Sequence, residues 1–103
     1  MTVYNKLVRD RIPQIISSCG EIPHTRILED KEYRALLEAK LDEEVAEYHE
    51  GRNLEELADI LEVIYALAEP FGGREELMRH YERKHAARGG FQNRVFLISK
   101  EEA

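Results

Sequence analysis

The segment KLDEEVAEYHEGRNLEELADILEVIYAL, from Lys40 to Leu67, contains the main helical pattern of this sequence. Apolar residues recur in it at spacings of three and four, which is typical of helices that pack along one face. Gly51 and Asn53 interrupt this pattern, and such residues commonly end one helix and cap the next. The stretch therefore predicts two helices, from about Lys31 to Glu50 and from Leu54 to about Glu69, folded into an antiparallel hairpin.

The flanking segments predict further elements. Asp10 is suited to cap a short helix in RIPQIISSC, and a third long helix is expected from about Arg74 to Arg88, before two glycines. The segments HTRIL (24–28) and NRVFLIS (93–99) are typical of short strands, which rarely lack a partner. We therefore expect a mainly all-α fold with a small two-stranded β appendage.

Composition limits the class of protein. The 103 residues carry a formal net charge of −6, which argues against nucleic acid as the main partner. The length predicts a single domain, residues 1–103, and so small a domain would gain from sharing a core in an oligomeric bundle. No apolar run reaches the length of a membrane span, and the N-terminus lacks the apolar core of a signal peptide. Cys19 is the sole cysteine, so no internal disulfide is expected, and a cytoplasmic location is predicted.

Several acids fall where the hairpin should pack. On a helical wheel the first helix has an apolar stripe, and Glu44 lies inside it, about 20° from Leu37, with Glu47 toward one side. On the second helix Glu56 lies among apolar residues, and Asp59 lies just beyond them. The stripe of the first helix comprises Tyr33, Leu37, Leu41, Val45 and Tyr48. An ionised acid on a packing face is costly unless it is paired or bound to metal.

The four acids also match in sequence distance from the turn. Glu47 and Glu56 are equally far from the turn, as are Glu44 and Asp59, so an antiparallel hairpin brings each pair to one level. An all-oxygen ligand set selects a hard cation, and Mg²⁺ suits it best and commonly takes phosphate oxygens as further ligands. A plainer alternative is that Lys40, one turn before Glu44, is its ion-pair partner.

The acidic pattern resembles a known signature. EEVAE (43–47) and ELAD (56–59) look like the EExxE and ExxD motifs of the MazG-like, all-α nucleoside triphosphate pyrophosphohydrolase superfamily, which includes phosphoribosyl-ATP pyrophosphohydrolase. The end segments YNKLVRDRIP and ARGGFQNRVFLI resemble a small single-domain branch of it. One departure is that the gap between the two motifs is shorter than is usual in the superfamily.

The resemblance implies Mg²⁺ ligation by Glu44, Glu47, Glu56 and Asp59. It also implies a homodimer or higher homo-oligomer whose helices form a shared bundle. The expected reaction is hydrolysis of a nucleoside triphosphate or related nucleotide to a monophosphate form and pyrophosphate, with house-cleaning of nucleotide pools as a role. Glu43 is the candidate general base.

Basic residues are the candidates for holding the phosphates. These residues are Lys84, Arg88, Lys6 and Arg9. For Lys84 and Arg88 the alternative is simply that cations favour a helix C-terminus. The alternative function is a non-catalytic nucleotide-binding or protein-interaction module that keeps the acidic helical fold.

Overall fold

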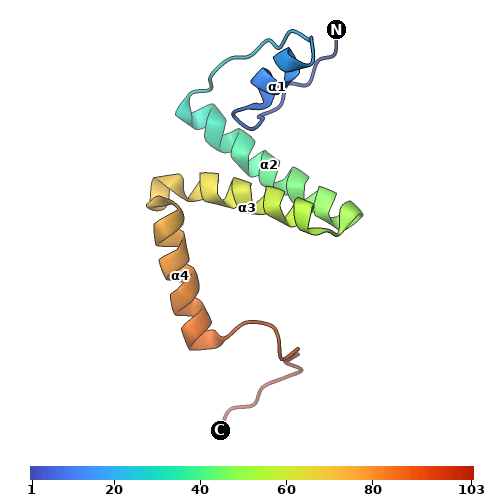
Figure 1. Ribbon diagram of the computed structural model, residues 1–103. Helices are drawn as coiled ribbons and strands as arrows, with labels where there is room; N and C mark the ends of the chain where they lie inside the picture. The colour runs from blue at the N-terminus through green and yellow to red at the C-terminus, as the bar shows by residue number, and fades with distance from the viewer.

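The computed structural model describes residues 1–103 as a chain of helices without strands (Figure 1). Four α-helices are joined by irregular segments, with a single 3₁₀ turn before the last one. Their bounds are α1 Ile12–Ser18, α2 Asp30–Gly51, α3 Leu54–Ala68, η1 Glu69–Phe71 and α4 Gly73–Arg88. The all-α expectation is thus confirmed for the helices.

The expected hairpin forms from α2 and α3, which pack against each other. The helix α2 continues through Gly51, and Arg52 then adopts a left-handed conformation with φ of 50°. Asn53 caps α3, because its side-chain oxygen accepts a hydrogen bond of 3.0 Å from the backbone N–H of Glu56. The turn is therefore short because one left-handed residue ends α2 and the next residue caps α3.

A second bend separates α3 from α4. Pro70 lies in η1, and Gly72 follows with φ of 113°. A Cβ atom on Gly72 would lie 2.8 Å from the Cβ of Glu76, so a residue with a side chain would strain this turn. The bend directs α4 away from the hairpin, so that α4 contacts α3 and η1 and makes no contact with α2 (Figure 1).

The N-terminal part differs in detail from expectation. The helix α1 is only seven residues long, and its N-cap position is Arg11, without a side-chain hydrogen bond. The expected cap at Asp10 is therefore wrong. Pro13 still lies in the first turn, where its missing N–H costs nothing.

The expected strand pair does not form. Residues 24–28 lie in the irregular connection before α2, and residues 93–99 lie in the segment after α4. The two segments are at opposite ends of an elongated molecule (Figure 1), so neither offers its backbone hydrogen-bonding groups to the other.

The chain buries little of itself. The radius of gyration is 18.7 Å, whereas a compact domain of this length has about 13 Å. Leu37 and Val63 are the buried large apolar residues, while Leu54, Leu57 and Leu61 of α3 stay exposed. None of the helices combines the length and apolar character needed to cross a membrane.

Candidate metal site

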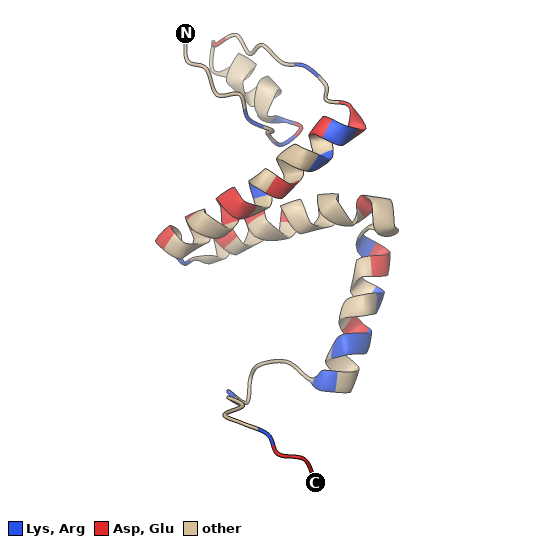
Figure 2. Ribbon diagram, turned by 180° about the vertical axis from the view of Figure 1, so that it is seen from behind, with Lys and Arg blue, Asp and Glu red and all other residues tan.

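Three carboxylates meet between α2 and α3. Glu44 comes from α2, Glu56 and Asp59 come from α3, and one oxygen from each lies within 4.8 Å of the others. We call these three residues the acid cluster. Figure 2 shows acidic residues concentrated on α2 and α3, the two helices of the hairpin.

Glu44 is the buried member of the acid cluster. Only 7% of its surface is exposed, and its Oε2 atom is buried without a hydrogen-bond partner. Burial is the main cause of a raised pKa at Glu44. The nearby carboxylate of Glu47 raises this pKa further, because it can share a proton with Glu44 in a hydrogen bond. Lys40, with Nζ 3.6 Å from Oε1 of Glu44, acts in the opposite direction. The expected Lys40 ion pair is therefore present, but it leaves the second oxygen of Glu44 unpaired.

Glu56 is positioned by the turn that precedes it. Its backbone N–H is held by Asn53, and its side chain lies directly against Gly51. A Cβ atom at Gly51 would lie 3.1 Å from Cγ of Glu56 and 3.4 Å from its Oε1. Glu56 also has a buried oxygen, Oε2, without a hydrogen-bond partner. The glycine thus leaves room for a carboxylate that the neighbouring side chains do not satisfy.

Glu47 and Glu43 flank the acid cluster. Glu47 is exposed and lies beside Glu44, outside the group of three. Glu43 bonds to two ammonium groups, with Lys6 at 2.9 Å and Lys40 at 3.3 Å. The hydrogen bond from Lys6 is the main cause of a lowered pKa at Glu43, although partial burial acts against it. In this paired state Glu43 is a weaker proton acceptor than a free glutamate.

The N-terminal segment brings two expected phosphate ligands to the acids. Arg9 donates to Asp59 at 2.7 Å and to Glu62 at 3.4 Å, while Lys6 donates to Glu43. The pKa of Lys6 is raised, chiefly by its hydrogen bond to Glu43. Lys6 and Arg9 thus lie next to the acid cluster, and both side chains are more than half exposed.

The other two expected phosphate ligands lie elsewhere in this chain. Lys84 and Arg88 are in the last turns of α4, where basic residues gather in Figure 2. Since α4 leaves from the end of α3 that is remote from Glu56, these two side chains do not join the acid cluster.

The donors fit a hard divalent cation. All are carboxylate oxygens, and Glu44 and Glu56 each have one buried oxygen without a hydrogen-bond partner. Two oxygens that bind one Mg²⁺ at about 2.1 Å are at most about 4.2 Å apart. Small side-chain rotations would bring the acid cluster into that range. Glu47 beside Glu44 could add a further oxygen.

Two contacts at the site were not predicted from the sequence. Glu62 is an exposed residue of α3, and it shares Arg9 with Asp59. Gly51 was expected only as a helix stop, whereas it also makes room for Glu56. The helical wheel carries no signal for either contact, because each depends on a neighbouring segment.

Comparison with known proteins finds a similar protein whose activity is not known. An uncharacterized protein of Mycolicibacterium smegmatis is 62% identical over 42 residues, which make up 41% of this chain and 43% of that protein. The chain therefore spans less than half the length of this relative in the match. No family model matches the sequence, and no solved structure matches it significantly.

Proposed function

We propose that this protein is a Mg²⁺-dependent nucleotide pyrophosphohydrolase. The substrate would be a nucleoside triphosphate or related nucleotide, and the products a monophosphate form and pyrophosphate. The motifs EEVAE and ELAD, with their resemblance to the MazG-like superfamily, suggest this reaction. The geometry supports it because the second motif and Glu44 of the first converge in the acid cluster.

The observation that carries the proposal is the unpaired Oε2 of Glu44. A carboxylate oxygen that is buried without a partner costs free energy, of the order of 1–3 kcal/mol for a buried polar group and more when it is charged. The Lys40 ion pair does not remove this cost, because it reaches Oε1 of Glu44 and leaves Oε2 without a partner. A cation held by Glu44, Glu56 and Asp59 would remove this cost.

The remaining residues have roles that follow from their positions. Bound Mg²⁺ would neutralise the phosphates and orient a water for in-line attack. Lys6 and Arg9 are close enough to the acid cluster to turn from their carboxylate partners toward phosphate oxygens. Once Lys6 has turned away, Glu43 would be a stronger base and could accept the proton of the attacking water.

Pyrophosphate release tests this proposal. The protein would be assayed with Mg²⁺ against a panel of nucleoside triphosphates, together with Glu44→Gln, Glu56→Gln and the control Glu38→Gln. Glu38 is an exposed acid of α2 outside the cluster, so its variant should keep full activity. Loss of activity in the two cluster variants is expected. Full activity in either of them would refute the assignment, and Mg²⁺-dependent binding without product across the panel would favour a non-catalytic binding module.

We also propose that the active form is a homo-oligomer. Leu54, Leu57 and Leu61 leave 79%, 43% and 44% of their surfaces exposed on one helix. Covering such a face with a second copy would complete the core that this elongated chain lacks. Size-exclusion chromatography with light scattering should show at least twice the mass of one chain.

A further inference from the structure

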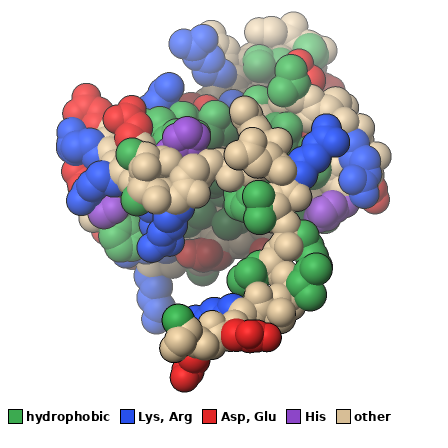
Figure 3. Space-filling view, turned by 90° about the horizontal axis from the view of Figure 1, so that it is seen from below, with side chains coloured by type: hydrophobic (Ala, Val, Ile, Leu, Met, Phe, Trp, Pro, Cys, Tyr) green, Lys and Arg blue, Asp and Glu red, His purple; other side chains and the backbone are tan.

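The segment after α4 is strongly apolar but uncovered. We call residues 91–102 the tail. Its large apolar side chains have exposed fractions between 76% and 97%, and it forms no helix or strand. Figure 3 shows hydrophobic side chains along this protruding segment. These residues are Phe91, Val95, Phe96, Leu97 and Ile98. A stretch of this kind calls for a surface that buries it.

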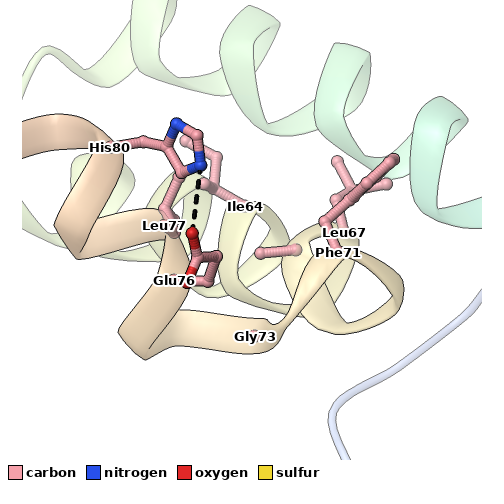
Figure 4. Close-up of a pocket in the computed structure, with 8 residues that line it drawn as sticks. Ile64, Leu67, Phe71, Gly73, Glu76, Leu77 and His80 are labelled. Carbon is pink, nitrogen blue, oxygen red and sulfur yellow. Dashed lines mark ion pairs between the residues drawn. The ribbon is translucent and has the colours of Figure 1, made fainter. Parts of the chain in front are cut away.

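A matching surface lies at the bend between α3 and α4. The groove there has a volume of about 340 Å³, with Phe71 and Leu77 on its wall and Glu76 and His80 on its polar edge (Figure 4). Its other apolar residues are Ile64, Leu67 and Ala68. Phe71 is 80% exposed, so this groove also lacks a cover.

The groove continues along α4 toward positive charge. Lys84 is seven residues beyond Leu77 and Arg88 is eleven beyond it, so both lie within about 20° of Leu77 around the helix. They follow Leu77 by about 10 Å and 16 Å along the axis. The same face of α4 is therefore apolar in its first turns and basic in its last.

The tail has the complementary order. Its apolar run ends at Ile98, and Glu101 and Glu102 come three and four residues later. In an extended chain this separation is about 10–13 Å. A tail that places Ile98 near Leu77 and runs in the direction of α4 would thus bring its acids to Lys84.

Chain direction decides which copy supplies the tail. A chain's own tail leaves α4 at Gly89 and must turn back to reach its groove, so it would run against α4. Its acids would then approach Glu75 and Glu76 in the first turn of α4. In a two-fold dimer with antiparallel α4 helices, the end of one α4 lies near the start of the other. The tail of one copy, after turning back, then runs along the partner's α4 from groove to basic end.

The apolar and charged residues of the tail follow one another in the order that matches α4, and the chain direction fits a second copy. We therefore propose that the tail of each copy docks in the α3–α4 groove of a second copy. The leucine and isoleucine side chains fill the groove, and Glu101 pairs with the second copy's Lys84. This contact does not involve the acid cluster and does not depend on the proposed activity.

Cross-linking between distinguishable copies tests the proposal. Cys19 is exposed and would react, so all chains carry Cys19→Ser. A tagged chain with Phe71→Cys is mixed with an untagged chain with Phe96→Cys, which keeps Leu97 and Ile98, and treated with a short bis-maleimide. Both positions are largely exposed, so neither change should disturb folding. We expect a tagged–untagged product in several-fold higher yield than with a control Glu38→Cys chain in place of Phe71→Cys.

Further variants test which copy supplies the tail and how the tail is aligned along α4. A single chain with both cysteines should give products of at least dimer mass, whereas an internal cross-link at monomer mass would overturn the proposal. Lys84→Glu should lower the yield several-fold, and adding Glu101→Lys with Glu102→Lys should restore it. A yield equal to that of the control, or one that ignores Lys84→Glu, would also overturn it.

Discussion

The guanidinium of Arg9 lies 2.7 Å from the carboxylate of Asp59 and joins the N-terminal segment to the acid cluster. Arg9 therefore occupies one carboxylate that the proposed cation would need. The same contact places a phosphate-binding side chain beside the cluster. The proposed cation and Arg9 therefore compete for the carboxylate of Asp59, and binding of the cation would release Arg9.

Replacing Arg9 should separate these effects. In Arg9→Gln we expect metal affinity without nucleotide to rise about 2- to 5-fold, because an exposed ion pair contributes up to about 1 kcal/mol. Pyrophosphate release should fall, because a phosphate ligand is lost. Calorimetric titration with Mg²⁺ and the pyrophosphate assay measure the two quantities. Arg26→Gln is the matched control, since Arg26 pairs with Glu32 away from the site. Unchanged or weaker metal binding in Arg9→Gln would contradict this competition.

Glu44 predicts a pH dependence of stability. Its pKa is raised on folding, so over a window above the ordinary value for glutamate the folded protein holds a proton that the unfolded chain has lost. Without metal, the free energy of unfolding should therefore fall as pH rises through this window. Glu44→Gln should remove that part of the decline and be more stable than the parent at neutral pH. Urea denaturation in chelator, repeated across pH, measures both.

Added Mg²⁺ provides the control for this titration. It should stabilise the parent protein at neutral pH and have much less effect on Glu44→Gln, since binding to the folded state alone raises stability. If the parent gains nothing from Mg²⁺, the cluster does not hold this cation. If Glu44→Gln shows the same decline with pH, another group causes it.

The helices and the acid cluster could be predicted because both follow from local periodicity. Apolar spacing placed α2 and α3, Asn53 marked the cap, and the equal distances of Glu44 and Asp59 from the turn placed them together. Each of these features depends on residues within a few helical turns of the hairpin connection.

The features that failed or were missed depend on contacts between distant segments. The strand pair requires residues 24–28 and 93–99 to meet, and the elongated chain separates them. Lys84 is distant from the acids because the turn at Gly72 sets the direction of α4, and a helical pattern does not specify that angle. Arg9 reaches Asp59 from a segment without periodicity.

Gly51 should matter for metal binding more than for folding. In Gly51→Ala the new Cβ would press on Cγ of Glu56, which is 3.1 Å away, and displace its carboxylate. Because alanine favours a helix over glycine by up to about 1 kcal/mol, stability should stay equal or rise. We expect metal affinity to fall several-fold by calorimetry while the urea midpoint does not fall. Glu50→Ala, at the adjacent exposed position, should leave affinity nearly unchanged.

Asn53 gives the converse prediction, in which folding and the site are both affected. Asn53→Ala removes the acceptor for the Glu56 N–H and should cost about 1 kcal/mol of stability. Because this bond fixes the first turn of α3, metal affinity should fall as well. Asn53→Ser keeps an oxygen acceptor and should retain most of both, as judged by urea denaturation and calorimetry. If serine and alanine behave alike, the cap does not position Glu56, and the placement of this carboxylate would rest on packing between α2 and α3 alone.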